Sequence, residues 1–163
     1  MAQQQPDLTG RRAALWDLEE WVRRGEAGIG AANLAPTAIA AACWQLSVTG
    51  FNACYLEELI FSTDTAIAVT LWSPLVGLAL AAVPTLSLIP FGAAPNGVSF
   101  NAGLLAPPAT SKVYLTGYLP AGWCGSLLGR MKLLLNDTDL LVLQTAAVAA
   151  NCAATFAFIG ANS

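Results

Sequence analysis

From Ala38 to the C-terminus the chain breaks into short apolar runs, and turn signals separate them. Clusters of proline, glycine and asparagine favour reverse turns and interrupt regular structure. Runs of this length are typical of strands rather than helices. Their spacing, with no helical pattern between them, predicts an all-β fold: an antiparallel β-sandwich or jelly roll. The signals are Thr49-Gly50, Ser73-Pro74, Pro90-Phe91-Gly92, Pro95-Asn96-Gly97, Pro107-Pro108, Pro120-Ala121-Gly122 and Asn136-Asp137.

Side chains alternate along several of these runs with the two-residue period of a strand. In the last run, for example, Cys152, Ala154, Phe156 and Phe158 share one face. The segment Ala38–Ala42 is also compatible with a helix. We expect strands at Cys43–Thr49, Cys54–Ser62, Ala66–Trp72, Val76–Ala81, Thr85–Ile89, Lys112–Leu119, Ser126–Leu135, Leu140–Thr145 and Cys152–Ile159.

The N-terminal segment has a different composition from the rest. The chain has 7 basic and 10 acidic residues, and nine of these charged residues precede Ala27. An amphipathic helix is expected over about residues 10–24, with its apolar stripe at i, i+3/i+4 and i+7 spacing. We divide the chain into a helical arm with a Gly/Ala-rich linker, residues 1–37, and a β-sandwich domain, residues 38–163. The helix either packs on its own domain or docks on a neighbouring subunit. Because the linker gives it reach, we expect docking through Leu15, Leu18, Trp21 and Val22.

Only 10% of the residues are charged, against roughly 25% in an ordinary soluble domain. So few charges cannot cover a monomer's surface, so lipid or neighbouring subunits must cover part of it. We therefore expect a symmetric homo-oligomer, in the form of a trimer. The net charge of −3 provides no basic field for phosphate groups, which argues against a nucleic-acid partner.

One uncharged run, Thr65–Ile89, is long enough to span a bilayer as a helix. Pro74 and Pro84 would interrupt such a helix twice, and Trp72 lies inside the run rather than near an interface. Short strands separated by prolines explain the run better. A membrane-associated protein remains an alternative.

The candidates for chemistry are few, because the chain contains no histidine. Its absence removes the commonest general base and metal ligand, together with every Ser-His or Cys-His pair. Glu57 and Glu58 are neighbours, so a regular strand would place them on opposite faces. Asp137 and Asp139 share parity, but their setting, L-N-D-T-D-L, is that of a hairpin turn. We expect no enzyme activity, no catalytic residues, no cofactor and no metal site.

Four cysteines are widely spaced, which is typical of buried thiols rather than of a zinc site. Cys43 and Cys54 are compatible with facing each other across a hairpin, and their spacing leaves their disulfide state open. Among the aromatic residues, Trp123 in the loop P-A-G-W-C-G is the one we expect to be exposed and available for a contact. The other candidates for a sugar or receptor site are Trp44, Trp72, Phe51, Tyr114 and Tyr118.

The last third of the chain carries a layout of its own. K-V-Y-L-T-G-Y-L-P is followed by L-L-L-N-D-T-D-L-L-V-L-Q-T, an alanine-rich turn and A-A-T-F-A-F-I-G-A. Over Lys112 to Ala161 this layout resembles the small β-sandwich proteins of tailed-phage virions, namely head decoration or cement proteins and related fibre modules. The resemblance implies an assembly role in the virion, commonly as a trimer on the capsid surface, with the major capsid protein or other virion subunits as partners. A receptor- or glycan-binding module of a tail or fibre is the alternative.

Overall fold

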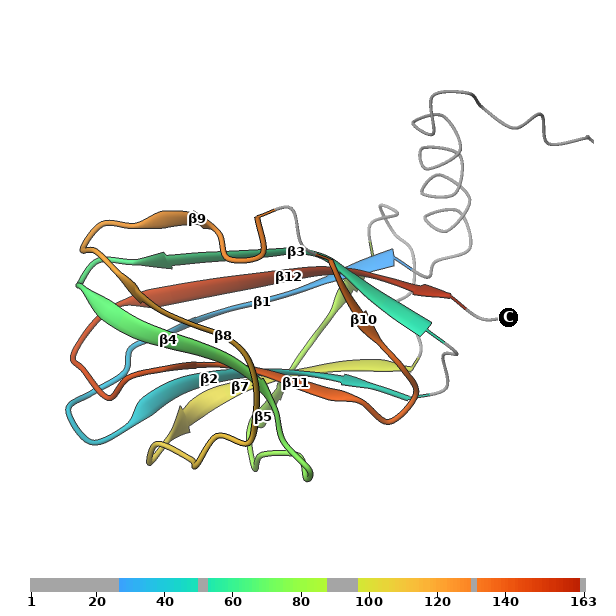
Figure 1. Cartoon of the computed structure of the whole chain (residues 1–163), viewed down its shortest axis with the longest axis horizontal. Coiled ribbons are helices and arrows are strands. Elements are labelled where there is room, and N and C mark those ends of the chain that lie inside the picture. Colours follow the sequence, from blue (N-terminus) through green and yellow to red (C-terminus); the bar gives the residue numbers. More distant parts are fainter. Residues whose placement is uncertain (1–26, 50–52, 88–96, 130–131, 162–163) are drawn as a thin grey trace, which may run out of the picture.

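The computed structural model describes residues 27–49, 53–87, 97–129 and 132–161. They form two antiparallel sheets packed face to face (Figure 1). The strands are β1 (Ala27–Leu34), β2 (Ala41–Val48), β3 (Ala53–Thr63), β4 (Ile67–Ser73), β5 (Ala81–Val83), β6 (Leu86–Ser87), β7 (Val98–Leu105), β8 (Lys112–Leu119), β9 (Cys124–Ser126), β10 (Leu133–Leu135), β11 (Leu140–Thr145) and β12 (Cys152–Ala161). The expected antiparallel β-sandwich is confirmed.

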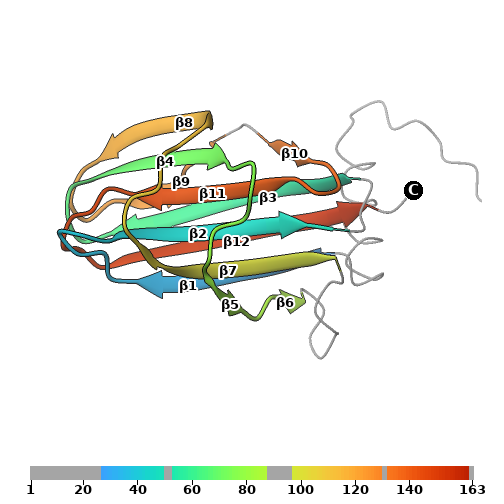
Figure 2. The ribbon, with the colours of Figure 1, turned by 90° about the horizontal axis from the view of Figure 1, so that it is seen from below.

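We call the two sheets A and C. Sheet A has the order β10-β3-β12-β1-β6, and β9 pairs with the same edge of β3 as β10. Sheet C has the order β5-β7-β2-β11-β4-β8. Strands far apart in the chain are neighbours, since β1 pairs with β12 and β2 with β11. Figure 2 shows sheet C from below, with β8 at its outer edge.

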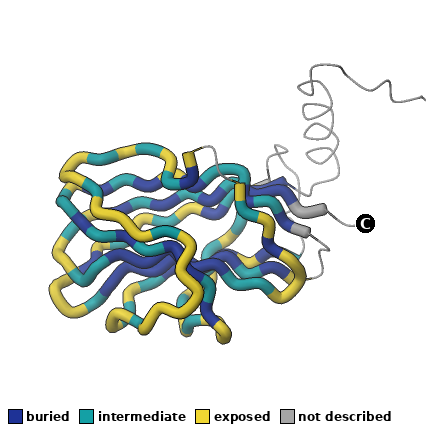
Figure 3. The backbone as a smooth tube through the Cα atoms, viewed as in Figure 1, coloured by how far each residue is buried: buried dark blue, intermediate teal, exposed yellow. Residues whose placement is uncertain are grey.

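The core lies between the sheets and is almost entirely apolar. Figure 3 marks the buried residues along the strands of both sheets. Trp44 and Phe61 meet edge to face with ring centroids 5.8 Å apart, and Phe100 packs on Phe156 at 5.3 Å. Fully burying one such side chain contributes about 1.5–3 kcal/mol, which makes this layer the main stabilising element. Every second residue of β12 from Cys152 to Phe158 faces it, as the alternation predicted.

The expected linker is wrong over Ala27–Leu34, because these residues form β1, which lies between β12 and β6. Small residues do not signal flexibility here. A Cβ atom on Gly30 would lie 2.5 Å from Cγ of Phe100, so glycine is required where the Phe100 ring packs on the sheet. The arm helix, with Leu15, Leu18, Trp21 and Val22, lies outside the described residues, and its docking stays a prediction.

Two strand predictions and one helical alternative are also wrong. In the expected strand Val76–Ala81, only Ala81 belongs to a strand. The apolar residues Leu78 and Leu80 instead pack on the outer face of sheet C. The expected strand Ser126–Leu135 is two short strands, and between them Gly129 has a φ of 58°. Ala38–Ala42 is not helical, since β2 begins at Ala41.

The strands near Cys43, Cys54, Ala66, Lys112, Leu140 and Cys152 are confirmed to within a few residues. In the uncharged run, residues 65–87 form β4, β5 and β6 with their connections. Within the described ranges, the structure contains no helix long and apolar enough to cross a membrane.

Candidate functional site

Two segments of the chain cover part of the outer face of sheet C, and the rest of that face is open. Residues 74–80 cross β11 and β2, with the Leu78 amide donating to Oε1 of Gln45 at 2.7 Å. Residues 106–111 also cross it, and Nε2 of Gln144 donates to the Pro108 carbonyl at 3.4 Å. Figure 2 shows both segments passing over the face of the sheet. Beneath them Cys43, Trp72 and Val142 are buried on the side of the sheet away from the main core.

The open part is β8, which pairs with β4 alone among the described strands. Val113, Tyr114, Thr116 and Tyr118 are exposed, and we call these four residues the β8 surface. Tyr118 is 71% exposed. The register shifts between Leu71 and Trp72, so Tyr114 is an extra residue opposite β4. Lys112, whose Nζ lies 5.4 Å from the Tyr114 ring centroid, is the only charged residue of the strand.

Next to the beginning of β8, the chain leaves β4 with two exposed apolar residues. Ser73 pairs with Lys112, and its carbonyl accepts a hydrogen bond of 2.8 Å from the Ser111 hydroxyl. Leu75 follows and is 96% exposed, and Val76 is exposed as well. This end of sheet C therefore presents apolar groups to solvent on two neighbouring elements, which is typical of an interaction surface.

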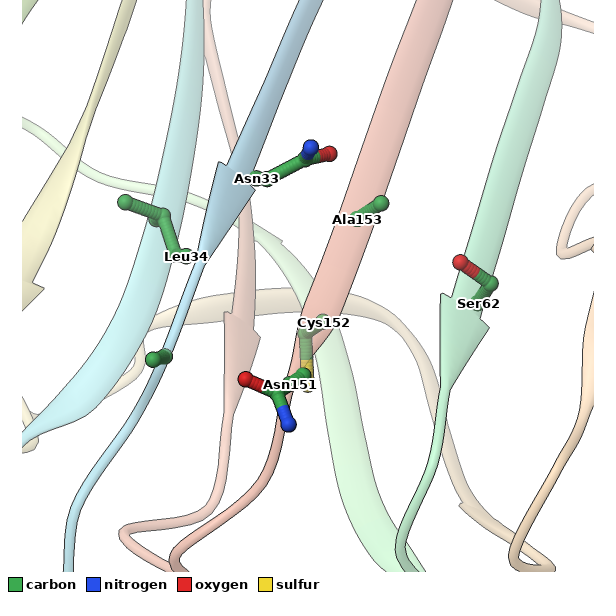
Figure 4. A pocket seen from close by; sticks show the side chains of 7 residues that line it. Asn33, Leu34, Ser62, Asn151, Cys152 and Ala153 are labelled. Carbon is green, nitrogen blue, oxygen red and sulfur yellow. The ribbon is translucent and has the colours of Figure 1, made fainter.

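A shallow pocket of about 420 Å³ lies at one end of sheet A. In Figure 4 the polar groups of Asn33, Ser62 and Asn151 stand at its border, contributed by β1, β3 and the residue just before β12. The amide of Asn151 is already engaged, because its Nδ2 donates to Asp64 at 2.5 Å. The seven lining residues include no aromatic ring and no charged group, so a sugar ring has no stacking surface there.

The predicted aromatic contact residue occupies a different position from the one expected. Trp123 is half-buried and packs on the core, with its ring 6.4 Å from that of Phe61. Its carbonyl accepts the Thr63 amide at 3.0 Å, which holds the loop against β3. Exposure of Trp123 was therefore the wrong expectation. Trp44 and Trp72 are buried, Phe51 lies outside the described residues, and Tyr114 and Tyr118 are the exposed members of that set.

The two acidic pairs lie in different parts of the chain, Glu57 and Glu58 on β3 and Asp137 and Asp139 between β10 and β11. A bulge in β3 places Leu56 and Leu59 both in the core, so Glu57 and Glu58 together take one outward position, contrary to the expected opposite faces. Glu57 forms an ion pair with Lys132. Asp139 belongs to a turn, as predicted, since its Oδ2 accepts the Asn136 amide at 2.7 Å. That turn links the two sheets rather than closing a hairpin.

Asp64 joins two turns at the end of the sandwich near the pocket. Its carboxylate accepts the Asn151 amide at 2.8 Å as well as the Asn151 side chain. These hydrogen bonds from Asn151, with a further one from Thr65, lower the pKa of Asp64 below its usual 3.8. A depressed folded-state pKa stabilises the protein above the unfolded pKa, and the contribution is lost as pH falls through the folded value.

We therefore expect Asp64→Asn to lower the melting temperature slightly at neutral pH, because the substitution removes the charge and leaves one acceptor oxygen for the two hydrogen bonds from Asn151. The difference in melting temperature between wild type and Asp64→Asn should shrink as the pH falls well below 3.8, because the carboxylate of Asp64 then becomes protonated. Differential scanning calorimetry of both proteins across this range checks it. A difference that stays constant with pH would show that the charge of Asp64 contributes nothing.

The four cysteines are all free thiols. Cys43 and Cys54 do not face each other, because β2 and β3 belong to different sheets and Cys43 lies under the crossing segments. Burial raises the pKa of each of these two thiols to about 12. Burial also raises the pKa of Cys152. Cys124 is exposed on β9.

Since the thiolate is the reactive form, we expect one fast-reacting thiol in the folded protein and four after unfolding. Titration with a chromogenic disulfide reagent measures both numbers. Cys124→Ser should remove the fast phase, whereas Cys43→Ser should leave it unchanged. A fast phase that survives in Cys124→Ser would contradict the assigned burial.

The described residues thus define a class, an antiparallel β-sandwich with one long, nearly uncharged edge strand. Comparison with family models, curated proteins and solved structures finds no match to this chain.

Proposed function

We propose that this chain is a structural protein of a virion, a capsid decoration or cement subunit that stabilises a tailed-phage head lattice as a homo-oligomer. The β8 surface is the observation that carries the proposal. An exposed strand edge with apolar side chains favours aggregation in a free protein, whereas an assembly covers it. Only seven described side chains are formally charged, and Glu57 and Lys132 neutralise each other.

The order of strand pairing supports the same proposal. Successive strands pair in a nested series, β1 with β12, β2 with β11, β3 with β10 and β4 with β8. We infer a jelly roll from this order, with β5, β6 and β7 inserted between β4 and β8. Jelly rolls occur in viral capsid proteins and also in lectins and cupins, so the order by itself selects no function. The low charge and the resemblance over Lys112–Ala161 favour assembly.

In this proposal the major capsid protein or another virion subunit is the partner, and assembly takes place in the host cytoplasm. The four free thiols favour folding in a reducing compartment. The expected arm contact, through Leu15, Leu18, Trp21 and Val22, would add a second attachment to the particle.

Cosedimentation with heads of the same virus that lack the chain tests this proposal. Purified protein should bind such heads saturably and raise the temperature at which they release their DNA. Heads that already carry the chain are the control and should bind no more. Protein that remains in the supernatant, but binds host cells or glycans, would replace this proposal by the receptor-binding alternative.

A further inference from the structure

We propose that a second copy of the chain pairs with β8 edge to edge and antiparallel, so that sheet C continues across a two-fold axis. The proposal rests on the proposed function and names the self-contact of its homo-oligomer, which it makes a dimer in place of the expected trimer. It follows from the lengths of the sheet edges, from the distribution of charge along β8, and from its exposed side chains.

Among the described strands, β8 differs in length from the other strands at sheet edges. β5, β9 and β10 have three residues each and β6 has two, whereas β8 has eight. Proteins protect exposed edges by keeping them short, by bulging them, or by placing prolines and several charges on them. β8 contains no proline, and its one charge is at its first residue, Lys112. Its one bulge is at Tyr114, so Leu115–Leu119 stay in regular register with β4. A second strand would pair its outward amides and carbonyls in a continuous ladder, in place of the water that solvates them in a free chain.

A second copy of β8 matches this edge in length and in charge. An antiparallel pair centred near Thr116 places the two Lys112 side chains at opposite ends, roughly 25 Å apart at about 3.3 Å per residue. That distance exceeds the Debye length at physiological salt, so the two charges do not repel appreciably. In this register Tyr118 lies opposite the partner's Tyr114, and aromatic cross-strand pairs are favourable. The short edges β5 and β6 offer no comparable match.

Thr116→Lys tests the pairing, because it sets two lysines opposite each other at the axis, where like charges destabilise a strand pair. Thr116 is exposed, and its hydroxyl approaches that of Thr70 at the surface, at 3.4 Å, so the variant should fold normally. Thr110→Lys is the matched control: it makes the same exchange at an exposed position before the strand begins.

Multi-angle light scattering of the full chain at micromolar concentration should give about twice the chain mass of 16.9 kDa. Thr116→Lys should give a monomer with an unchanged circular dichroism spectrum, whereas Thr110→Lys should remain a dimer. Hydrogen exchange provides a second measurement. In wild type, the β8 amides that point away from β4 should exchange at least tenfold more slowly than in Thr116→Lys.

A trimer, or an oligomer whose mass Thr116→Lys does not change, overturns the β8 pairing. So does a wild-type monomer with unprotected β8 amides. The cosedimentation assay measures binding to heads separately. The β8 pairing can therefore fail while the proposed virion role is still supported. Occupation of the edge by the chain's own N-terminal arm would appear as a monomer with protected β8 amides, and it also overturns the pairing.

Discussion

Trp44→Ala is expected to cost about 3–5 kcal/mol of unfolding free energy, the usual range for removing a large buried aromatic side chain. Trp44 is fully buried, and its ring contacts Phe61 from the opposite sheet. Its Nε1 also donates a hydrogen bond of 2.9 Å to the carbonyl of Ala32 on β1. The side chain therefore connects sheet C to sheet A by packing and by a hydrogen bond. Removing it opens a cavity and leaves that carbonyl without its donor.

Urea denaturation followed by circular dichroism measures this loss. Trp44→Phe should be less destabilising, because it keeps an aromatic ring in the core and loses the hydrogen bond. Leu75→Ala is the exposed control, since Leu75 is 96% exposed, and its effect should stay within about 0.5 kcal/mol. Equal stabilities for Trp44→Ala and Leu75→Ala would be incompatible with Trp44 lying between the sheets.

Gly30→Ala is the second substitution with a large expected effect, although it adds only one methyl group. The new Cβ would lie 2.5, 2.7 and 2.9 Å from three atoms of the Phe100 side chain. Phe100 cannot move away freely, because it is buried and packs on Phe156. Overpacking of this kind costs about 1–3 kcal/mol, and we expect the upper end of that range.

Gly117→Ala is the matched control, a strand glycine whose added Cβ would meet no atom within 4 Å. Its melting temperature should equal that of the wild type or exceed it slightly. Phe100→Leu tests whether Phe100 is the cause. It should lower the unfolding free energy less in the Gly30→Ala variant than in the wild type, which corresponds to a favourable coupling energy between the two positions. Additive effects would mean that the methyl group on residue 30 meets something other than Phe100.

The sequence identified the fold class because turn residues and alternation are local signals. β1 was missed because Ala27–Leu34 consists largely of small residues, and the need for Gly30 arises from Phe100, which is distant in sequence. β7 was missed although Val98, Phe100 and Ala102 alternate inward, a signal that was present. Val76–Ala81 carries apolar residues because it covers the sheet, and periodicity does not distinguish that role from pairing.

The candidate site was harder to predict than the fold. The exposure of Tyr114 and Tyr118 follows from the position of β8 at the edge of sheet C. An edge position depends on the order of strands, and no local pattern in K-V-Y-L-T-G-Y-L encodes it. Trp123 looked exposed for the converse reason, since its loop has turn composition while its ring packs on Phe61 of another strand.

Electron cryomicroscopy of heads before and after addition of the purified chain tests the central claim most directly. If the chain is a capsid decoration subunit, added density of the size and shape of the two-sheet sandwich should appear at equivalent positions over the whole head lattice. Density at the tail alone, or no added density at saturating protein, would contradict a role as a capsid decoration subunit.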